Sequence, residues 1–364
     1  MENTLFMAGL GGRIFNCTLR ALANQGKITQ LKGVSASGQK NLDEIAEKIQ
    51  HDSTHRYFPL DVCARGLKEG EDLGAGHLGF LVFMTSGSFF GNKPCDYKHE
   101  VPVFGQPDPS LLPLADLGID VAIDASGRFL TREKAVAFLK AGAKKVVMSA
   151  PAKDDTPLVI YGINNEVDTG LDVVSRASCT TTCAAPIVKA LGDKYGMPRN
   201  IFLNTTHAVT NSQLSLDGNS ASFANGFGCM DNIVVTSTGA TKSLKIMFPE
   251  IGNTTGISCR VPVTDGSICC LVMSFDESMK GKITREDVIE TLREYEKDHP
   301  LNIRVSHRKT MISTYVIGRG IGSIVAPGQV EVHDNIVHVI AGYDNEYGYA
   351  YLLALSALNC PLPA

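Results

Sequence analysis

The chain has 364 residues, of which 44% are apolar and 20% charged, with a formal net charge of −4 at pH 7 and a pI of about 6.1. This length predicts two domains with a sizeable core, and the lack of a basic excess argues against a nucleic-acid partner. No apolar stretch is long enough to span a membrane. Ten scattered cysteines, without the even framework of a small secreted protein, favour a reducing, cytoplasmic setting.

The N-terminal residues carry the order strand, glycine-rich turn, helix and strand of a dinucleotide-binding unit. Residues 4–10 predict a buried strand rather than a signal peptide, because no basic residue precedes them. Gly9 and Gly11 predict the turn that lets the backbone approach a pyrophosphate at the following helix N-terminus, and residues 31–36 predict the second strand. The third glycine of the G-x-G-x-x-G pattern would fall on Ile14, so this signal alone is weak.

The end of the second predicted strand bears on the choice of cofactor. Residues 34–40 include Ser37 and Lys40 but no acidic residue, whereas NAD sites usually place a carboxylate here to bind the ribose hydroxyls. Hydroxyl residues with Lys40 suit a 2′-phosphate, and a solvated turn with an incidental lysine is an equal alternative. The sequence therefore leaves NAD and NADP both open.

Strands and helices continue to alternate up to residue 149. We expect short strands within residues 41–115, a strand over 119–126, a helix over 131–141 and a strand over 145–149. The alternation predicts an α/β fold in which a doubly wound parallel sheet forms a dinucleotide-binding domain. A ligand of such a sheet lies at the strand ends, here Gly9, Ser37, Ser126 and Ser149.

Cys179 stands where the next helix is predicted to begin. A cysteine there faces unpaired backbone N–H groups and the positive end of the helix dipole, which favour a thiolate. Cys179 is therefore a candidate nucleophile, and a small buried structural cysteine is the alternative. Cys183 lies one helical turn further on and is expected to pack, because no further Cys or His completes a metal site with His207.

The second half of the chain predicts a second domain of the α+β class. Helices are expected over 239–248 and 285–297, between long strands of the antiparallel type over 201–209, 256–263, 267–275, 312–317 and 336–341. An apolar helix over 349–358 is expected to pack back on the first domain. The predicted division is a dinucleotide-binding domain over 1–178, a catalytic α+β domain over 179–342 and a C-terminal segment over 343–364.

Several motifs resemble those of the phosphorylating glyceraldehyde-3-phosphate dehydrogenases, whose active-site segment reads S-C-T-T-N-C-x-A-P. The matching run here is Ser178-Cys179-Thr180-Thr181-Thr182-Cys183-Ala184-Ala185-Pro186. Similar blocks follow the family's order over nearly the whole chain: DSTH at 52–55, SGRF at 126–129, GAKK at 142–145, SAP at 149–151, THAVT at 206–210, STGATK at 237–242, RVP at 260–262 and YDNEYGY at 343–349.

The resemblance implies a mechanism in which the Cys179 thiolate attacks an aldehyde and the hemithioacetal passes a hydride to the nicotinamide. Inorganic phosphate then cleaves the thioester to an acyl phosphate, and His207 is the base. Hydroxyls, backbone N–H groups and a guanidinium suit phosphate oxygens. The resemblance assigns Ser178, Thr180, Thr238 and Gly239 to the attacking phosphate, and Thr210 and Arg260 to the phosphate of the substrate.

The same resemblance implies the cofactor contacts. Asn345 would anchor the nicotinamide carboxamide, with Tyr349 packing nearby. The remaining contacts are expected from Gly9, Gly11, Arg13, Ile14, Ser37, Lys40, Ser126, Gly127 and Ser149. Three departures from the family pattern concern the cofactor: the family's N-G-F-G-R-I-G-R becomes AGLGGRIFN at 8–16, Ser37 stands in place of the usual acidic residue, and Gly342 replaces a tryptophan. In addition, Thr182 replaces the usual asparagine, and residues 220–231 lack the Arg or Lys that often supplies a further anion contact.

Our main hypothesis is an NAD- or NADP-dependent enzyme of the glyceraldehyde-3-phosphate dehydrogenase type. Its partners would be a small phosphorylated aldehyde and inorganic phosphate, with no metal, nucleic acid or membrane, and it would be a homotetramer by resemblance. One alternative is a dehydrogenase for another phosphorylated aldehyde, such as erythrose 4-phosphate. The other is a catalytically weak paralogue that serves in binding or regulation.

Overall fold

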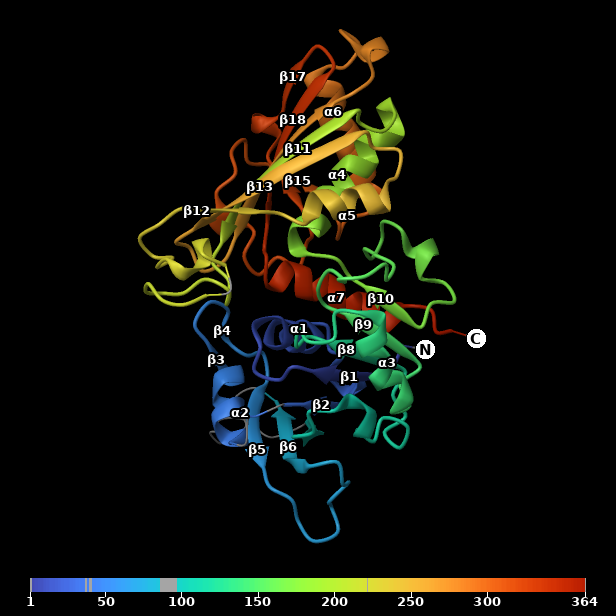
Figure 1. Cartoon of the computed structure of the whole chain (residues 1–364), viewed down its shortest axis with the longest axis vertical. Coiled ribbons are helices and arrows are strands. Elements are labelled where there is room, and N and C mark those ends of the chain that lie inside the picture. The colour runs from blue at the N-terminus through green and yellow to red at the C-terminus, as the bar shows by residue number, and fades with distance from the viewer. Residues whose placement is uncertain (1, 37, 39–40, 86–96, 221, 364) are drawn as a thin grey trace. The chain divides into compact units, whose positions relative to one another are not determined.

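The computed structural model describes residues 2–36, 38, 41–85, 97–220 and 222–363 (Figure 1). The chain forms two compact units. The first contains Met1–Val159, Asn165–Arg176 and Leu353–Ala364, and the second contains Ile160–Asn164 and Ala177–Leu352. The three-part division drawn from the sequence stays a prediction. None of the helices within the described ranges is long and apolar enough to cross a membrane.

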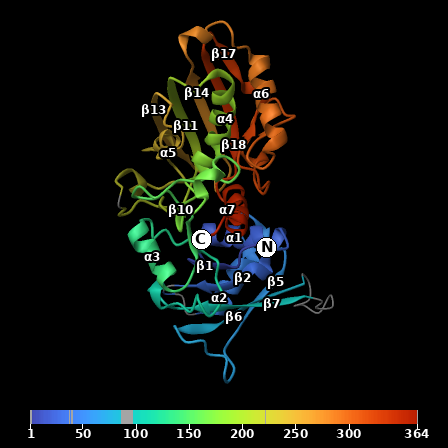
Figure 2. The same cartoon turned by 90° about the vertical axis from the view of Figure 1, so that its right-hand side faces the viewer.

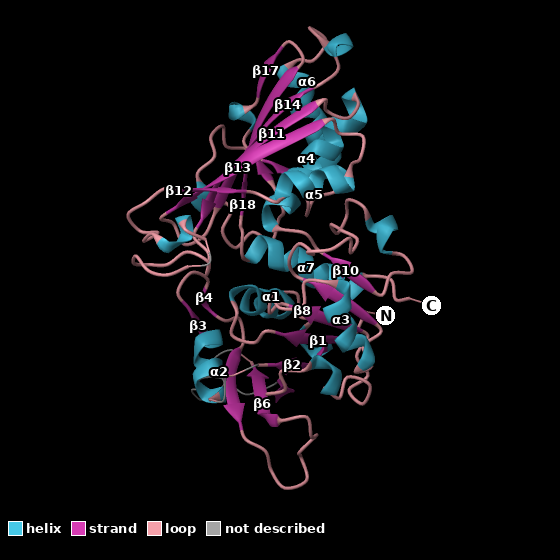
Figure 3. Ribbon diagram, in the orientation of Figure 1, coloured by secondary structure: helices cyan, strands magenta, loops and turns pink. Residues whose placement is uncertain are grey.

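An eight-stranded sheet forms the centre of the first unit, in the order β10-β9-β8-β1-β2-β7-β6-β5. Figure 3 labels β1, β2, β6, β8 and β10 of this sheet. The pairs from β10 to β7 are parallel, and β6 and β5 extend the sheet by antiparallel pairing. The strands are β1 Leu5–Ala8, β2 Leu31–Ser35, β5 Asp61–Arg65, β6 His77–Met84, β7 Lys98–Phe104, β8 Val121–Asp124, β9 Lys145–Met148 and β10 Val173–Ser175. The small hairpin β3 His51–Asp52 and β4 Arg56–Tyr57 lies apart from this sheet.

The helices of the first unit are α1 Arg13–Asn24, α2 Leu42–Gln50 and α3 Arg132–Lys140, with short 3-10 turns at Ile28–Gln30, Pro109–Leu111 and Asn165–Asp168. Strand β1 is fully buried, because Leu5, Phe6 and Met7 all have no exposed surface. Phe6 packs in one apolar cluster with Phe138 of α3. The predicted fold class, a doubly wound α/β sheet, is confirmed for this unit. A binding crevice in such a sheet opens where the strand order reverses, which here lies between β1 and β8.

The second unit is built on a mixed sheet in the order β12-β13-β11-β14-β18-β16-β15, with β17 also paired to β18. Its strands are β11 Asn200–Ala208, β12 Val234–Ser237, β13 Asn253–Val261, β14 Ser267–Ser274, β15 Arg304–Val305, β16 Ile324–Val325, β17 Glu331–His333 and β18 Ile336–Tyr343. Helices α4 Cys179–Tyr195, α5 Ala240–Met247 and α6 Arg285–Asp298 lie together along one side of the sheet (Figure 2). The predicted α+β class is confirmed, but the long strands are not all antiparallel. After β11 the chain passes through β12 and α5, and β13 then runs parallel to β11.

The strand expected over 312–317 is wrong. Ser313–Tyr315 forms a 3-10 turn, one of four in this unit with Ala224–Gly226, Glu277–Met279 and Pro327–Gln329. Val316 is buried without a strand, because it packs with Met311 and with Ile324 of β16, whereas Ile312 is 51% exposed. A run rich in β-branched and aromatic residues therefore does not form a strand here.

Helix α7, Tyr347–Asn359, closes the chain, and its residues from Leu353 onward belong to the first unit. Asn3 fixes this end by donating side-chain hydrogen bonds to the carbonyl oxygens of Ala357 (3.0 Å) and Cys360 (2.9 Å). The buried Lys145 donates to the carbonyl of Pro361 at 2.9 Å. Asn3 and Lys145, both in the first unit, thus hold its C-terminal segment in place.

Candidate active site

Cys179 is the first residue of α4, as predicted. Ser178 is the N-cap residue, with an extended backbone (φ −121, ψ 163) and a hydroxyl that accepts from the N–H of Thr181 at 3.2 Å. Ala177, just before it, is buried with a positive φ of 55°, a conformation that costs a non-glycine residue on the order of 1 kcal/mol or more. The turn at Ala177 and the cap at Ser178 together fix the direction in which α4 starts.

His207 faces Cys179 from the neighbouring strand. Burial alternates along β11, and His207 lies with Leu203 and Thr205 on its buried face. The Cys179 Sγ and His207 Nε2 atoms are 3.5 Å apart, within reach of a thiol–imidazole hydrogen bond. The structure therefore brings together the two residues that sequence reasoning had chosen as nucleophile and base.

Arg260 joins this pair through the sheet register. The parallel pairing of β11 with β13 places Arg260 opposite His207. Arg260 Nη1 lies 2.7 Å from His207 Nδ1 and 3.3 Å from the carbonyl oxygen of Ala208, which is itself 2.7 Å from Nδ1. Within the described part of the chain no carboxylate pairs with Arg260, so its positive charge is available to an anion.

Burial sets the protonation of the pair. It raises the pKa of the Cys179 thiol to about 11, although the Arg260 charge acts in the opposite direction. Burial first, and then the Arg260 charge, lower the pKa of His207 to about 4. Burial also lowers the pKa of Arg260. At neutral pH the ligand-free site therefore favours a neutral thiol beside a neutral imidazole, and the helix N-terminus alone does not produce a thiolate.

Tyr343 is a member of the site that sequence reasoning missed. Its hydroxyl, fully buried, lies 2.8 Å from the Thr180 hydroxyl and 2.7 Å from that of Thr205, and its ring edge contacts the His207 imidazole with centroids 5.9 Å apart. The available signal was Thr205, a polar residue at a buried position of an alternating strand. The Thr180 hydroxyl, predicted to bind phosphate, is thus engaged inside the protein.

Asn345 is tied to the strand of His207 through Ser267. The Ser267 hydroxyl donates to the Asn345 carbonyl oxygen at 2.7 Å and accepts from the backbone N–H of Ala208 at 3.1 Å. Tyr349, buried in the same unit, donates to the carbonyl of Ala177 at 3.4 Å. Sequence reasoning missed Ser267, which fixes the amide predicted to hold a nicotinamide.

The other residues predicted to bind phosphate lie further along the same sheet. Thr210 is exposed just beyond β11, where its hydroxyl contacts Gln213 at 2.9 Å. Thr238 and Gly239 form the start of α5, and the Thr238 hydroxyl accepts from the N–H of Ala240 at 3.3 Å. Ser237 pairs with Ile257, which lies three positions before Arg260 and so about 10 Å from it along β13.

Two of the departures from the family pattern, at Thr182 and Gly342, have local explanations. The Thr182 hydroxyl donates to the carbonyl of Ser178 at 3.0 Å, within the first turn of α4. A Cβ atom on Gly342 would lie 2.6 Å from the Met311 sulfur and 2.8 Å from Val316, so these residues fill the space that a side chain would need. Cys183 is fully buried and contacts the Ser323 hydroxyl at 3.5 Å.

The predicted cofactor residues of the first unit surround the β1–α1 turn. Gly9 and Gly11 have positive φ angles of 102° and 88°, and a Cβ on Gly9 would lie 2.7 Å from the backbone of Ala125 and Ser126. Ile14 follows in the first turn of α1, which begins at Arg13. A side chain on Gly9 would clash with the backbone just beyond β8, so only glycine permits this close approach of the ends of β1 and β8.

The loop after β8 is organised by the buried Asp124. Its carboxylate accepts from the Ser126 hydroxyl (2.5 Å) and backbone N–H (2.9 Å), while its carbonyl accepts from the Ser149 N–H at 3.0 Å. Gly127 follows with a φ of 69°. Ser126, Gly127 and Ser149 thus share one edge of the sheet, as predicted.

Arg13, one of the predicted cofactor contacts, forms its ion pair elsewhere. Arg13 forms an ion pair with Asp52 at 2.5 Å, and the Asp52 carboxylate also accepts from the N–H groups of Thr54 and His55. Burial of Asp52 is outweighed by the His55 and Arg13 hydrogen bonds, which hold its pKa below the usual value. Ser37 and Lys40 lie outside the described residues, so their assignment stays a prediction.

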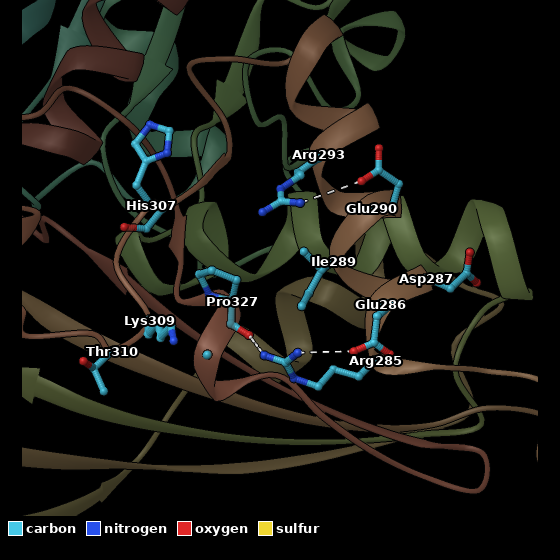
Figure 4. A pocket seen from close by; sticks show the side chains of 12 residues that line it. Arg285, Glu286, Asp287, Ile289, Glu290, Arg293, His307, Lys309, Thr310 and Pro327 are labelled. Atoms are coloured by element: carbon cyan, nitrogen blue, oxygen red, sulfur yellow. Dashed lines mark hydrogen bonds and ion pairs between the residues drawn. The ribbon is translucent and has the colours of Figure 1, made fainter.

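An open depression of about 970 Å³ between α6 and the 306–310 and 327–328 loops contains none of the predicted site residues (Figure 4). Arg285 donates to the carbonyl of Pro327 at 2.6 Å and to Val330 at 2.9 Å, and Arg293 pairs with Glu290 at 3.8 Å. These cations are already engaged. The hydrogen bonds of Arg285 connect α6 to the loop at 327–330.

The fold and site define a two-unit protein that combines a doubly wound, dinucleotide-binding type of sheet with an α+β unit carrying a cysteine–histidine pair. A family model described as the glyceraldehyde 3-phosphate dehydrogenase C-terminal domain matches residues 178–345. The chain is 32% identical over 343 residues to glyceraldehyde-3-phosphate dehydrogenase of Bacteroides fragilis, covering 93% of each chain. It is 36% identical over 265 residues to the cytosolic enzyme of Antirrhinum majus (72% of this chain and 75% of the relative) and 31% identical over 356 residues to glyceraldehyde-3-phosphate dehydrogenase 2 of Staphylococcus aureus (96% and 93%). The chain belongs to the glyceraldehyde-3-phosphate dehydrogenase family.

Proposed function

We propose that the protein oxidises glyceraldehyde 3-phosphate to an acyl phosphate, with NAD or NADP as hydride acceptor and inorganic phosphate as second substrate. The observation that supports this most is the cluster of Cys179, His207 and Arg260, in which Sγ lies 3.5 Å from Nε2 and the guanidinium 2.7 Å from Nδ1. A nucleophile, a base and an unpaired cation are the groups that a phosphorylated aldehyde requires.

In the proposed reaction the Cys179 sulfur attacks the aldehyde carbon while His207 Nε2 takes the thiol proton. His207 returns this proton to the carbonyl oxygen, which forms the hydroxyl of the hemithioacetal, and takes it back as the hydride leaves to give a thioester on Cys179. A bound oxidised nicotinamide would supply the hydride acceptor. A phosphate oxygen then attacks the thioester carbon, and the C–S bond breaks to release the acyl phosphate and return the Cys179 thiolate.

The residues of the first unit are proposed to bind the dinucleotide. Gly9 and Gly11 adopt positive φ angles at the end of β1, and Ser126 and Ser149 lie at the same sheet edge, where their backbone N–H groups donate to Asp124. Asn345 in the second unit is proposed to bind the nicotinamide carboxamide through its amide, which Ser267 holds in one orientation. The preference between NAD and NADP depends on Ser37 and Lys40.

Phosphate binding is proposed to rest on Arg260 and the hydroxyl residues around it. Arg260 and Thr210 would take the substrate phosphate, and Ser178, Thr180, Thr238 and Gly239 the inorganic phosphate. The guanidinium of Arg260, which is held by His207 and Ala208 and by no carboxylate of the described residues, supports the first part. The internal hydrogen bond of Thr180 limits that residue to its backbone N–H at the start of α4, which is itself a group suited to an anion.

The decisive experiment follows reduced cofactor with purified protein, glyceraldehyde 3-phosphate and inorganic phosphate, in separate reactions with NAD and with NADP. We expect turnover that depends on phosphate. Cys179→Ala should abolish it, and His207→Gln should lower kcat by about 10² to 10⁴-fold. Arg293→Met, which removes an exposed arginine of the same unit, is the matched control. Without turnover on this aldehyde or on erythrose 4-phosphate, run in parallel, the proposal fails.

We also propose a homotetramer in the cytosol. Large apolar side chains are exposed in the second unit along residues 216–235 and on the open face of its sheet, namely Leu216, Phe223, Phe227, Met230, Ile233, Val235, Phe202, Ile257 and Ile336. Exposed apolar surface of this extent is typical of a protein interface. All described cysteines are free, which agrees with a reducing compartment. Light scattering of the purified protein measures the mass, and a monomer would contradict the assembly.

A further inference from the structure

Nδ1 of His207 has two neighbours with incompatible demands. Arg260 Nη1 can only donate a hydrogen bond, and it lies 2.7 Å away. The carbonyl oxygen of Ala208 can only accept one, and it also lies 2.7 Å away. Nδ1 can offer a lone pair to the guanidinium or a proton to the carbonyl. The two contacts therefore define two alternative tautomers of the same imidazole.

The tautomer decides what His207 can do for Cys179. When Arg260 donates to Nδ1, the neutral ring carries its proton on Nε2, and this N–H points to the sulfur 3.5 Å away. The ring then has no lone pair with which to take the thiol proton. When Nδ1–H donates to the Ala208 carbonyl instead, Nε2 has a free lone pair and can act as the base.

Among the described residues, only neutral groups hold Arg260 in the first arrangement. Its two contacts are His207 Nδ1 and the carbonyl of Ala208 at 3.3 Å, and its Nε is buried without a hydrogen-bond partner. A guanidinium forms shorter and roughly twice as strong hydrogen bonds with an ionised oxygen as with a neutral acceptor. A phosphate oxyanion near Arg260 would therefore displace the imidazole as its acceptor.

We infer that Arg260 is a positioning residue that holds His207 in the Nε2–H tautomer until a phosphate oxyanion takes the guanidinium, after which the ring proton resides on Nδ1 and Nε2 serves Cys179 as base. The two tautomers differ only in the place of one proton, which exchanges with solvent, so the switch consumes nothing. Phosphate binding and the base-competent tautomer favour each other reciprocally. The inference rests on the proposed function for the identity of the anion.

The charge of Arg260 acts in the same direction. It contributes to the low pKa of His207, so an anion that neutralises it makes the imidazole a stronger base. A site without phosphate thus holds a poor base beside a protonated thiol, and a site with phosphate holds a competent one. The aldehyde's own phosphate and inorganic phosphate share this chemistry, and the experiment separates them.

The experiment records ¹⁵N spectra of the full-length protein labelled at histidine, at neutral pH, with His207 assigned by its loss in His207→Gln. The wild type without phosphate is expected to show Nε2–H. Saturation with inorganic phosphate, or with glycerol 3-phosphate as the phosphate source of the substrate, should change the tautomer ratio by on the order of tenfold or more. Whichever ligand produces the change identifies the anion that Arg260 takes.

Arg260→Met tests the effect of Arg260 on the His207 tautomer in the absence of any ligand. With no donor at Nδ1, His207 should be in the Nδ1–H form, and phosphate should no longer alter it, while Arg293→Met should behave like the wild type. Nδ1–H in the wild type without phosphate, a wild-type ratio that neither ligand alters, or Nε2–H in Arg260→Met would each overturn the inference. Circular dichroism checks the fold of each variant, and the wild-type titration decides the matter if Arg260→Met does not fold.

The same preparations are assayed for dehydrogenase activity, which separates this inference from the proposed function. A tautomer response without turnover keeps the role of Arg260 and refutes the activity. Turnover without any change in the tautomer ratio supports the proposed activity and refutes the role of Arg260 as a positioning residue. Arg260→Met should keep the base-competent tautomer and raise KM through the lost phosphate contact, so its kcat at saturating aldehyde should stay well above that of His207→Gln.

Discussion

Tyr343→Phe tests how the buried hydroxyl network holds the site together. The tyrosine hydroxyl contacts Thr180 of α4 and Thr205 of β11, at 2.8 and 2.7 Å, and all three side chains are buried. Phenylalanine keeps the ring but leaves two buried threonine hydroxyls each without this partner. Each unsatisfied buried group costs about 1 to 3 kcal/mol, so we expect the free energy of unfolding to fall by about 2 kcal/mol or somewhat more.

Urea denaturation followed by circular dichroism measures this loss, since a lower midpoint at unchanged slope reports stability alone. Tyr315→Phe, which removes a hydroxyl from a partly exposed ring of the same unit, is the control and should change the free energy by less than about 0.5 kcal/mol. Because Thr180 follows Cys179, the variant should also loosen the thiol–imidazole contact and lower kcat. A Tyr343→Phe protein as stable as the wild type would refute the network as a structural element.

Three further predictions concern other parts of the chain. Gly9→Ala, with a φ of 102° and a Cβ 2.7 Å from backbone atoms, should cost about 2 to 4 kcal/mol in urea denaturation, whereas Gly26→Ala, with a φ of 68° and open space, should cost only about 1 kcal/mol; equal losses would contradict the close approach. Burial, and then Asp344 and Glu346, raise the pKa of Asp265 in the folded protein. The folded state then keeps a proton that the unfolded state releases above about pH 4, so the stability of the protein falls as pH rises from there. Asp265→Asn should flatten this decline, which thermal scans between about pH 5 and 8 would measure. Asp168 is buried between Lys145 (2.6 Å) and Arg176 (2.7 Å), so Asp168→Ala should destabilise the first unit by about 3 to 5 kcal/mol, and a loss below about 1 kcal/mol would show that the pairs contribute little.

The start of α4 and the β1–α1 turn could be predicted because local chemistry determines them. A hydroxyl residue before an apolar helical run is an N-cap signal, and Ser178 is that cap. The turn glycines Gly9 and Gly11 both adopt positive φ angles. Helix α2 carried an equally local signal that was missed. The Asn41 side chain accepts from the N–H groups of Asp43 and Glu44, and Glu44 accepts from Asn41 in return.

The contact between His207 and Arg260 could not be predicted from the chain. The two residues are 53 positions apart, and their approach depends on β12 and α5 returning the chain so that β13 lies parallel to β11 in one register. Side chains alternate between the two faces of a strand, so a slip of one residue would move Arg260 to the opposite face. Apolar patterning could indicate two strands here, but it does not determine which strands pair or in which register.

The departures at Thr182 and Gly342 involve neighbours other than Cys179, His207 and Arg260. Thr182 binds back to the start of its own helix, and Met311 occupies the space above Gly342. The positions of Cys179, His207 and Arg260 instead depend on Ser178, on the β11–β13 register and on the Tyr343 hydroxyl, all of which are intact. The proposed acyl transfer and the cofactor preference are therefore separable properties of this chain. A variant that changes Ser37 or Lys40 should alter the choice between NAD and NADP while the alkylation of Cys179 stays the same.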